Sequence, residues 1–315
     1  MSAIFDLYGP LPTGTTVLEA SAGTGKTFTI AGLVTRYVAE GVCQLDDMLV
    51  VTFGRAATQE LRDRVRERLV TARDGLSDPA TARTQTGDVL LRHLAIGDDT
   101  EVANRRARLA TALAGFDAAT VATTHQFCQQ MLIGLGTAAD LDADATLVES
   151  IDDLVDEVAR DLYVRMWAGD YVTFVPMTQA QALEVARAAV HDEQATLVPD
   201  TAARDSAPDL RVRFARKVRE DVDARKRARR ILGFDDLLTR LQSTLTDPDT
   251  GPAAAARLQG RYRVVLVDEF QDTDPVQWDI LRRAFHGAAT LVLIGDPKQA
   301  IYAFRGADVH AYLDA

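Results

Sequence analysis

The chain has 315 residues, of which 47% are hydrophobic and 26% charged, and a net charge of −11. This composition is typical of a globular protein and argues against one coated in positive potential. No apolar run reaches the ~20 residues that span a bilayer, and residues 1–12 lack the features of a signal peptide, so we expect a cytoplasmic protein without membrane contact. Cys43 and Cys128 stand far apart without a nearby histidine or second cysteine, which predicts two buried thiols and neither a zinc site nor a disulfide.

Residues 15–34 predict a strand, a small-residue loop and a helix, in that order. In such a loop, successive backbone N–H groups face one concavity and the helix start adds its positive dipole end, which together bind phosphate. Lys26 is expected to be a solvent-facing charge that reaches the β- and γ-phosphates, and Thr27 to be a magnesium ligand. The predicted nucleotide-binding residues of this loop are Ala20, Ser21, Ala22, Gly23, Thr24, Gly25, Lys26 and Thr27.

The match to the phosphate-loop pattern is incomplete, because the pattern asks for glycine at the position of Ala20. Only Gly23, Gly25, Lys26 and Thr27 agree with it. The alternative is a small-residue turn that carries an exposed lysine, and this segment alone does not decide between the two.

Residues 48–53 are apolar almost throughout, which predicts a buried strand of a parallel sheet. The helix expected over residues 54–65 places Leu61 and Val65 on one face. Phe53 and Arg55 then fall at the carboxyl end of the strand, the edge where open α/β sheets bind ligands. A core position is the alternative for Phe53.

Residues 71–116 predict helical segments near residues 89–94 and 105–113, without catalytic motifs. Residues 121–128 predict a short strand that runs into a helix, with His125 at the junction. Two interpretations stay open for this histidine, a structural role and a contact with a phosphate oxygen.

Residues 136–230 have helical spacing and no comparably strong strand, which predicts a helical insertion between two parts of one α/β domain, residues 1–135 and 231–315. Within it, residues 211–230 hold ten basic and three acidic side chains. This segment is either the solvated face of a long helix or a contact with nucleic acid.

Two further buried strands are predicted over residues 263–267 and 289–295. Asp268 and Glu269 directly follow the first, where an aspartate can hold magnesium and a glutamate can orient a water. A phosphate cradle, a metal ligand and a base at adjacent strand ends are what an ATP hydrolase needs.

Six segments together resemble superfamily 1 DNA helicases of the UvrD/Rep type and, among these, the exodeoxyribonuclease V beta (RecB) subunits. The segments occur in family order and are residues 20–27, 51–57, 124–128, 233–236, 268–275 and 295–308. Alanine at the Ala20 position is common in such helicases.

The resemblance implies a RecA-like P-loop NTPase fold with an α/β parallel sheet, the cofactors ATP and Mg²⁺, and ATP-driven movement on DNA in double-strand-break repair and recombination. It implies DNA and RecC-like and RecD-like subunits as partners of a full-length parent. The implied catalytic residues are Lys26, Glu269 and Gln299, with Gln271 at the γ-phosphate and Thr27 and Asp268 at the metal. The implied DNA-binding residues are Phe53, Arg55, His125, Tyr302, Phe304 and Arg305.

Two departures from the family pattern limit these expectations. The glutamine motif that reads adenine in many relatives is not found before the phosphate loop, which leaves the nucleotide preference open. The sequence ends at Ala315, whereas such helicases continue into a second motor domain that supplies arginines to the ATP site. We therefore expect residues 1–315 to bind ATP but hydrolyse it slowly. Rival functions are a nucleotide-dependent single-stranded DNA-binding module and a small-molecule kinase, the latter disfavoured by residues 299–308.

Overall fold

The computed structural model describes residues 5–20, 25–136, 145–148, 150–169, 174–192, 195–199 and 201–299. The chain divides into two compact units: unit 1 comprises residues 1–139 and 238–315, and unit 2 comprises residues 140–237. Among the described residues, no helix combines the length and the apolar character needed to cross a membrane.

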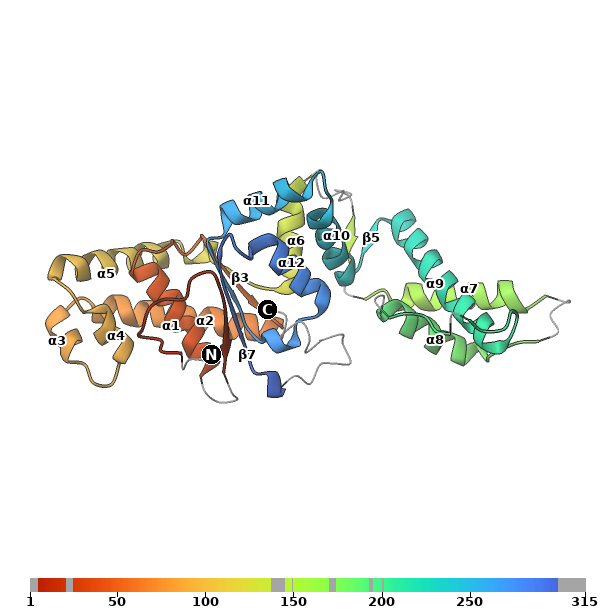
Figure 1. Ribbon diagram of the computed structural model, residues 1–315, viewed down its shortest axis with the longest axis horizontal. Helices are drawn as coiled ribbons and strands as arrows, with labels where there is room; N and C mark the ends of the chain where they lie inside the picture. Colours follow the sequence, from red (N-terminus) through yellow and green to blue (C-terminus); the bar gives the residue numbers. More distant parts are fainter. Residues whose placement is uncertain are drawn as a thin grey trace. The chain divides into compact units, whose positions relative to one another are not determined.

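Unit 1 is built on a five-stranded parallel sheet (Figure 1). The strand order is β1-β7-β6-β2-β3. The strands are β1 (Thr15–Glu19), β2 (Met48–Thr52), β3 (Thr120–Thr123), β6 (Val264–Val267) and β7 (Thr290–Gly295). The predicted α/β fold with a parallel sheet is confirmed, and all five carboxyl ends meet at one edge.

The central strands are buried on both faces, which explains why their sequences are apolar without alternation. Met48 and Val50 of β2 belong to the hydrophobic cluster on one face, whereas Leu49 and Val51 point to the other, and all four are buried. Strand β6 is likewise buried at every position. Such a strand must lie in the middle of a sheet that is covered by helices on both sides.

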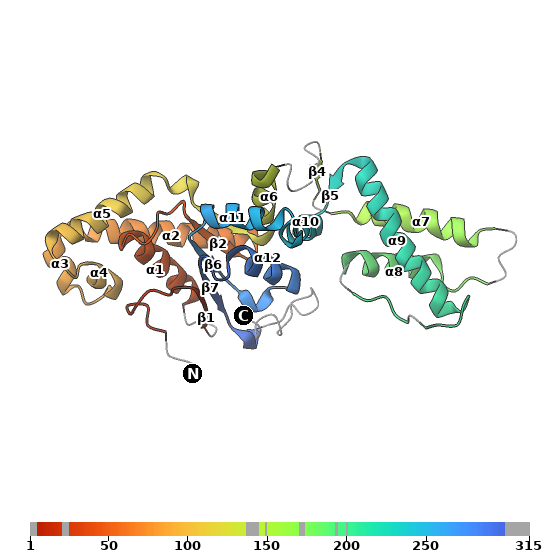
Figure 2. The same cartoon turned by 45° about the horizontal axis from the view of Figure 1, so that its top comes forward.

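Helices cover both faces of the sheet (Figures 1 and 2). One hydrophobic cluster joins the sheet to α1 (Lys26–Ala39), α2 (Arg55–Gly75), α3 (Pro79–Thr84), α4 (Val89–Leu94) and α5 (Asp99–Ala114). The other helices described in unit 1 are α6 (Thr124–Leu135), α10 (Phe234–Thr246) from Leu238 onward, α11 (Gly251–Arg261) and α12 (Pro275–Phe285), with short 3₁₀ turns η1 (Phe116–Ala118), η3 (Phe270–Asp272) and η4 (Pro297–Gln299). The rings of Phe127 in α6 and Phe285 in α12 pack against each other, with their centroids 6.2 Å apart.

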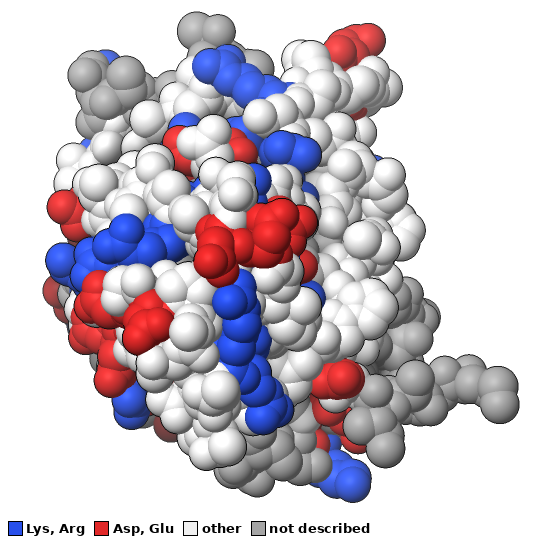
Figure 3. All heavy atoms as spheres, turned by 90° about the vertical axis from the view of Figure 1, so that its left-hand side faces the viewer, with Lys and Arg blue, Asp and Glu red and all other residues white. Residues whose placement is uncertain are grey.

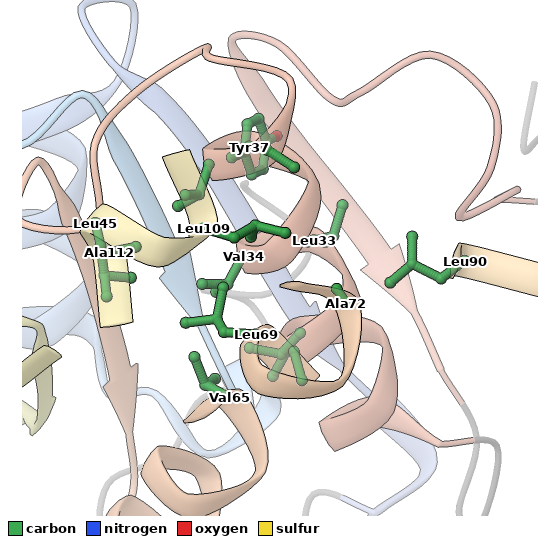
Figure 4. Close-up of a cluster of buried hydrophobic side chains, with 14 of the residues drawn as sticks. Leu33, Val34, Tyr37, Leu45, Val65, Leu69, Ala72, Leu90, Leu109 and Ala112 are labelled. Carbon is green, nitrogen blue, oxygen red and sulfur yellow. The ribbon is translucent and has the colours of Figure 1, made fainter. Parts of the chain in front are cut away.

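Helices α1, α2 and α5 meet in a tightly packed part of this cluster (Figure 4). Leu69 of α2 is fully buried there, so truncation to alanine removes apolar contacts and leaves a cavity. We expect Leu69→Ala to lower the free energy of unfolding by about 2–5 kcal/mol in urea denaturation. Ile133→Ala, which shortens an exposed side chain of α6, is the control and is expected to change it by less than about 0.5 kcal/mol.

The helix that follows β2 and the segment 89–94 lie where the sequence predicts them, and both cysteines are buried as predicted. Helix α3 was not predicted, because it is too short to show an apolar periodicity in the sequence. Its start is set by a capping residue instead. The Asp78 side chain accepts a hydrogen bond from the Thr81 backbone N–H and so starts the helix.

Helices α3 to α5 form one end of unit 1, where basic and acidic side chains lie side by side (Figure 3). Two ion pairs involve residues of α3 to α5 or their N-caps: Arg68 binds Asp88 at 2.5 Å and Arg83 binds Asp99 at 2.7 Å. The face therefore carries both charges in a mixture rather than one continuous basic patch.

Unit 2 is a bundle of three helices, α7 (Asp152–Trp167), α8 (Gln179–His191) and α9 (Ala207–Arg229). Its core includes Trp167 and Phe214, whose ring centroids lie 5.3 Å apart. A parallel pair of two-residue strands, β4 (Thr146–Leu147) before α7 and β5 (Ile231–Leu232) after α9, flanks these helices in the sequence, and α10 (Phe234–Thr246) follows β5 along the chain.

The basic segment 211–230 lies mostly on α9, where acidic neighbours offset much of its charge. Arg225 binds Asp161 at 2.6 Å and Arg229 binds Glu157 at 2.6 Å, both acids being on α7. Lys217 pairs within α9 with two acidic residues. These contacts favour the interpretation as a solvated helix face, since an arginine that is already paired has less charge to offer to a phosphate.

Candidate functional site

Three neighbouring strands, β1, β7 and β6, bring the predicted nucleotide residues to one edge of the sheet. The phosphate-loop segment follows β1, the Asp268-Glu269 pair follows β6, and residues 296–299 follow β7. Since the strands are parallel and adjacent, segments that are up to 270 residues apart in sequence converge at their carboxyl ends.

The backbone of the loop leads into α1 through a left-handed residue. Gly25 has φ 82° and caps the helix, and its carbonyl accepts the first helical hydrogen bond from Thr29 N–H at 2.8 Å. A residue with a side chain is strained in this conformation, which explains the glycine. Lys26 and Thr27 are then the first residues of α1, at its anion-binding end. Ala20 binds Gly295 through its backbone N–H, and residues 21–24 lie outside the described residues.

The expectation that Lys26 faces solvent is wrong. Its ammonium group forms an ion pair with Oε2 of Glu269, and only 12% of the side chain is exposed. The physical reason is charge: the chain folds so that the carboxylate at the end of β6 faces the ammonium group of Lys26. The structure thus brings together two of the three predicted catalytic residues, Lys26 and Glu269.

Asp268 lies beside this pair and is half-buried. Burial, together with the charge of Glu269, raises the pKa of Asp268 to about 6. A half-buried carboxylate that lies beside another carboxylate is well suited to a cation, and oxygen donors are what magnesium prefers. Thr27 and Asp268 offer one hydroxyl and one carboxylate, which fits an ion that completes its shell with water and phosphate oxygens.

Asp272 is a third carboxyl group of this cluster that the sequence did not single out. It is 7% exposed, and its Oδ1 accepts no hydrogen bond from the described residues. Burial and the neighbouring Glu269 raise the pKa of Asp272 to about 6, against the opposing effect of Lys26.

This raised pKa makes stability depend on pH. The folded state binds the proton of Asp272 more tightly than the unfolded chain does. Ionised Asp272 therefore lowers the free energy of unfolding above pH 6, and this destabilisation disappears as the pH falls toward 4. We expect Asp272→Asn to stabilise the nucleotide-free protein by about 1–2 kcal/mol near pH 7 and by less near pH 4.5, measured in urea. Asp117→Asn, at an exposed position, is the control. Destabilisation of Asp272→Asn near pH 7 would contradict this assignment.

Gln271 links the ends of β6 and β7. Its Nε2 donates to Oε2 of Glu269 at 2.6 Å, and its Oε1 accepts from the Asp296 backbone N–H at 2.9 Å. Only 3% of the residue is exposed.

Asp296 in turn accepts hydrogen bonds from the Gln299 side chain and from the Lys298 backbone N–H. Asp296 was missed in the sequence, although its position directly after a buried strand was a usable signal.

Three further predicted residues, Phe53, Arg55 and His125, lie at the other half of the same edge. Phe53 follows β2, Arg55 begins α2 and His125 is the second residue of α6, after β3. Strands β2 and β3 are neighbours, with Thr52 paired to Thr123, so these residues share one region. Arg55 is exposed, and Phe53 and His125 are half-buried. Tyr302, Phe304 and Arg305 lie outside the described residues.

Comparison with known proteins agrees with this geometry. The family model of the UvrD/REP helicase N-terminal domain matches residues 9–315. The chain belongs to the UvrD/REP helicase family. This membership accounts for the joint presence of the phosphate loop after β1 and the carboxylate pair after β6.

Relatives within the UvrD/REP family include RecB subunits and a UvrD-type helicase. The chain is 54% identical, over 99% of its length, to the RecBCD enzyme subunit RecB of Mycolicibacterium smegmatis, of which it covers 28%. It is 29% identical to the Escherichia coli subunit of the same name, covering 35% of it, and 28% identical to the ATP-dependent DNA helicase UvrD2 of Mycobacterium bovis, covering 37%. The chain therefore spans about a third of the length of these relatives.

Proposed function

We propose that the chain is the ATP-binding motor domain of a RecB-type DNA helicase, which couples ATP hydrolysis to movement on DNA in break repair and recombination. The observation that carries this proposal is the convergence of Lys26, Asp268 and Glu269 at adjacent strand ends. The sequence similarity to RecB subunits supports it across nearly the whole chain.

Each residue of the site has a defined task in this proposal. Lys26 exchanges its ion pair with Glu269 for the β- and γ-phosphates, and the N–H groups at the start of α1 bind phosphate oxygens. A magnesium ion held by Thr27 and Asp268 would neutralise charge on the phosphates. Gln299, whose side chain donates to Asp296, senses the γ-phosphate in this proposal.

Glu269 is the general base of the reaction. The oxygen of a water bonds to the γ-phosphorus while its proton passes to the Glu269 carboxylate. The bond from the γ-phosphorus to the β,γ-bridging oxygen breaks, which gives ADP and phosphate. Departure of Lys26 toward the nucleotide frees the carboxylate for this role, so that base and substrate become available together.

We propose that single-stranded DNA passes along the ends of β2 and β3. Half-buried rings of Phe53 and His125 can stack on bases without regard to sequence, and Arg55 can contact a phosphate. Tyr302, Phe304 and Arg305 extend this path in the proposal. The relatives' name, RecBCD enzyme subunit, further suggests RecC-like and RecD-like partners for the complete protein.

DNA binding is testable through its dependence on salt. Arg55→Gln is expected to weaken the binding of a fluorescent oligonucleotide and to reduce the slope of log affinity against log salt by about 0.7, the value for one lost phosphate contact. Fluorescence anisotropy across a salt series measures this slope. Arg160→Gln, which removes an exposed arginine of α7, is the control. An unchanged slope in Arg55→Gln would remove Arg55 from the path, and failure of the wild type to bind would count against a DNA motor.

A further inference from the structure

The side chain of Gln271 is held at both ends and faces protein groups on each side. Its amide nitrogen donates to Glu269, its amide oxygen accepts from the backbone of Asp296, and only 3% of the residue is exposed, so the contacts of both ends are with protein groups. The family resemblance implies a contact of Gln271 with the γ-phosphate, whereas the geometry gives it another task. It ties the carboxylate after β6 to the backbone at the end of β7.

The absence of a side chain at Gly295 makes this tie possible. A β-carbon at Gly295 would lie 2.6 Å from Oε1 of Gln271 and 3.0 Å from its backbone nitrogen. Contacts this short require one of the two groups to move. The last residue of β7 therefore has to be glycine if the Gln271 amide is to reach Asp296.

Glu269 itself needs to be held in place. Its backbone is left-handed, with φ 51° and ψ 41°, a conformation that residues with side chains rarely adopt. Two donors hold its carboxylate, the Lys26 ammonium and the Gln271 amide, and both bind the same oxygen, Oε2. Oε1 accepts no hydrogen bond from the described residues, and 34% of the side chain is exposed.

These contacts distinguish the two carboxylate oxygens. When Lys26 moves to the phosphates, Gln271 is the donor that remains on Oε2 among the described residues. We propose that Gln271 is a positioning residue, which fixes Oε2 of Glu269 and thereby directs Oε1 toward the attacking water; this inference rests on the proposed ATP hydrolysis. Asp296 and Gly295 support the positioning from β7.

The substitution Gln271→Glu keeps one of the two contacts and removes the other. The new carboxylate can still accept a hydrogen bond from the Asp296 N–H, but it has no N–H to donate to Glu269 and repels that carboxylate. A reacting group displaced by about 1 Å can lose about a hundredfold in rate, so we expect single-turnover ATP cleavage to fall by about that factor. The dissociation constant of magnesium-ADP is expected to rise by less than about tenfold, because the added negative charge lies near the phosphates while the contacts of Gln271 itself are with protein groups.

Two further variants test the same contact by other routes. In Gly295→Ala, the new β-carbon displaces Oε1 of Gln271 from the Asp296 backbone. We expect this variant, like Gln271→Glu, to cleave ATP more slowly than the wild type. The double variant Glu269→Gln with Gln271→Glu restores the hydrogen bond with its donor and acceptor exchanged. It is expected to regain the melting temperature of the wild type without regaining cleavage.

Gln242→Glu is the matched control, since the Gln242 amide also donates to a carboxylate, that of Asp279 at 3.1 Å, away from the site. It is expected to cleave ATP at the wild-type rate. If Gln271→Glu binds magnesium-ADP normally and also cleaves at the wild-type rate, while Glu269→Gln does not cleave, the inference is overturned and the proposed function stands. If the wild type shows no Lys26-dependent nucleotide binding, the proposed function fails and the inference fails with it.

Discussion

Lys26→Ala is expected to abolish the stabilisation that magnesium-nucleotide gives to this protein. A ligand present at about 100 times its dissociation constant stabilises the folded state by about 2.7 kcal/mol, which appears as a higher melting temperature. Lys26 is the first residue of α1 and the cation of the phosphate site, so the variant loses the main charge that attracts the β- and γ-phosphates. Thermal melting with and without magnesium-ADP measures the loss.

The same substitution is expected to leave the nucleotide-free fold intact. Removal of Lys26 breaks its ion pair with Glu269, but that carboxylate keeps the hydrogen bond from Gln271 and is partly solvated. We expect a change in the nucleotide-free stability of no more than about 1 kcal/mol. Lys217→Ala, which removes an exposed, ion-paired lysine of α9, is the control and should keep the full nucleotide shift. A persistent shift in Lys26→Ala would refute the phosphate-loop assignment.

Much of the fold could be predicted from the sequence, because its strongest signals are local. The apolar runs of β2, β6 and β7 require strands buried on both faces, and the small-residue segment before Lys26 requires a strand, a turn and a helix. Chain order and parallel pairing then place the phosphate loop and Asp268 at the same edge. The residue types of the site follow from this topology alone.

The contacts within the site could not be predicted in this way. The pairing of Lys26 with Glu269 depends on which anion is nearest in three dimensions, and no spacing in the sequence encodes it. The orientation of Gln271 depends on the space left by Gly295 on another strand. Asp272 carries no signal beyond its place in an acidic segment. It is distinguished by its burial and by its Oδ1, which accepts no hydrogen bond from the part of the chain that the structure describes.

Glu269→Gln is expected to reduce ATP cleavage by a factor of about 100 to 10,000, the usual contribution of a general base. The amide oxygen of the new side chain can still accept hydrogen bonds from Lys26 and Gln271, so the group keeps its place. The position next to the water, however, is then occupied by an NH₂ group, which cannot accept a proton. Magnesium-ADP binding is expected to be retained, because one negative charge fewer lies near the phosphates.

Single-turnover measurement with excess protein is the appropriate assay for Glu269→Gln, since it detects cleavage even when turnover is slow. Slow turnover is itself expected where no arginine stabilises the transferred phosphoryl group, a contribution worth about 10³ to 10⁵ in rate. Glu220→Gln, at an exposed position of α9, is the control and should cleave like the wild type. Equal rates for Glu269→Gln and wild type would show that another group activates the water. Nucleotide binding without any cleavage by the wild type would instead identify a nucleotide-dependent DNA-binding module, because the site would then hold its ligand without the geometry to hydrolyse it.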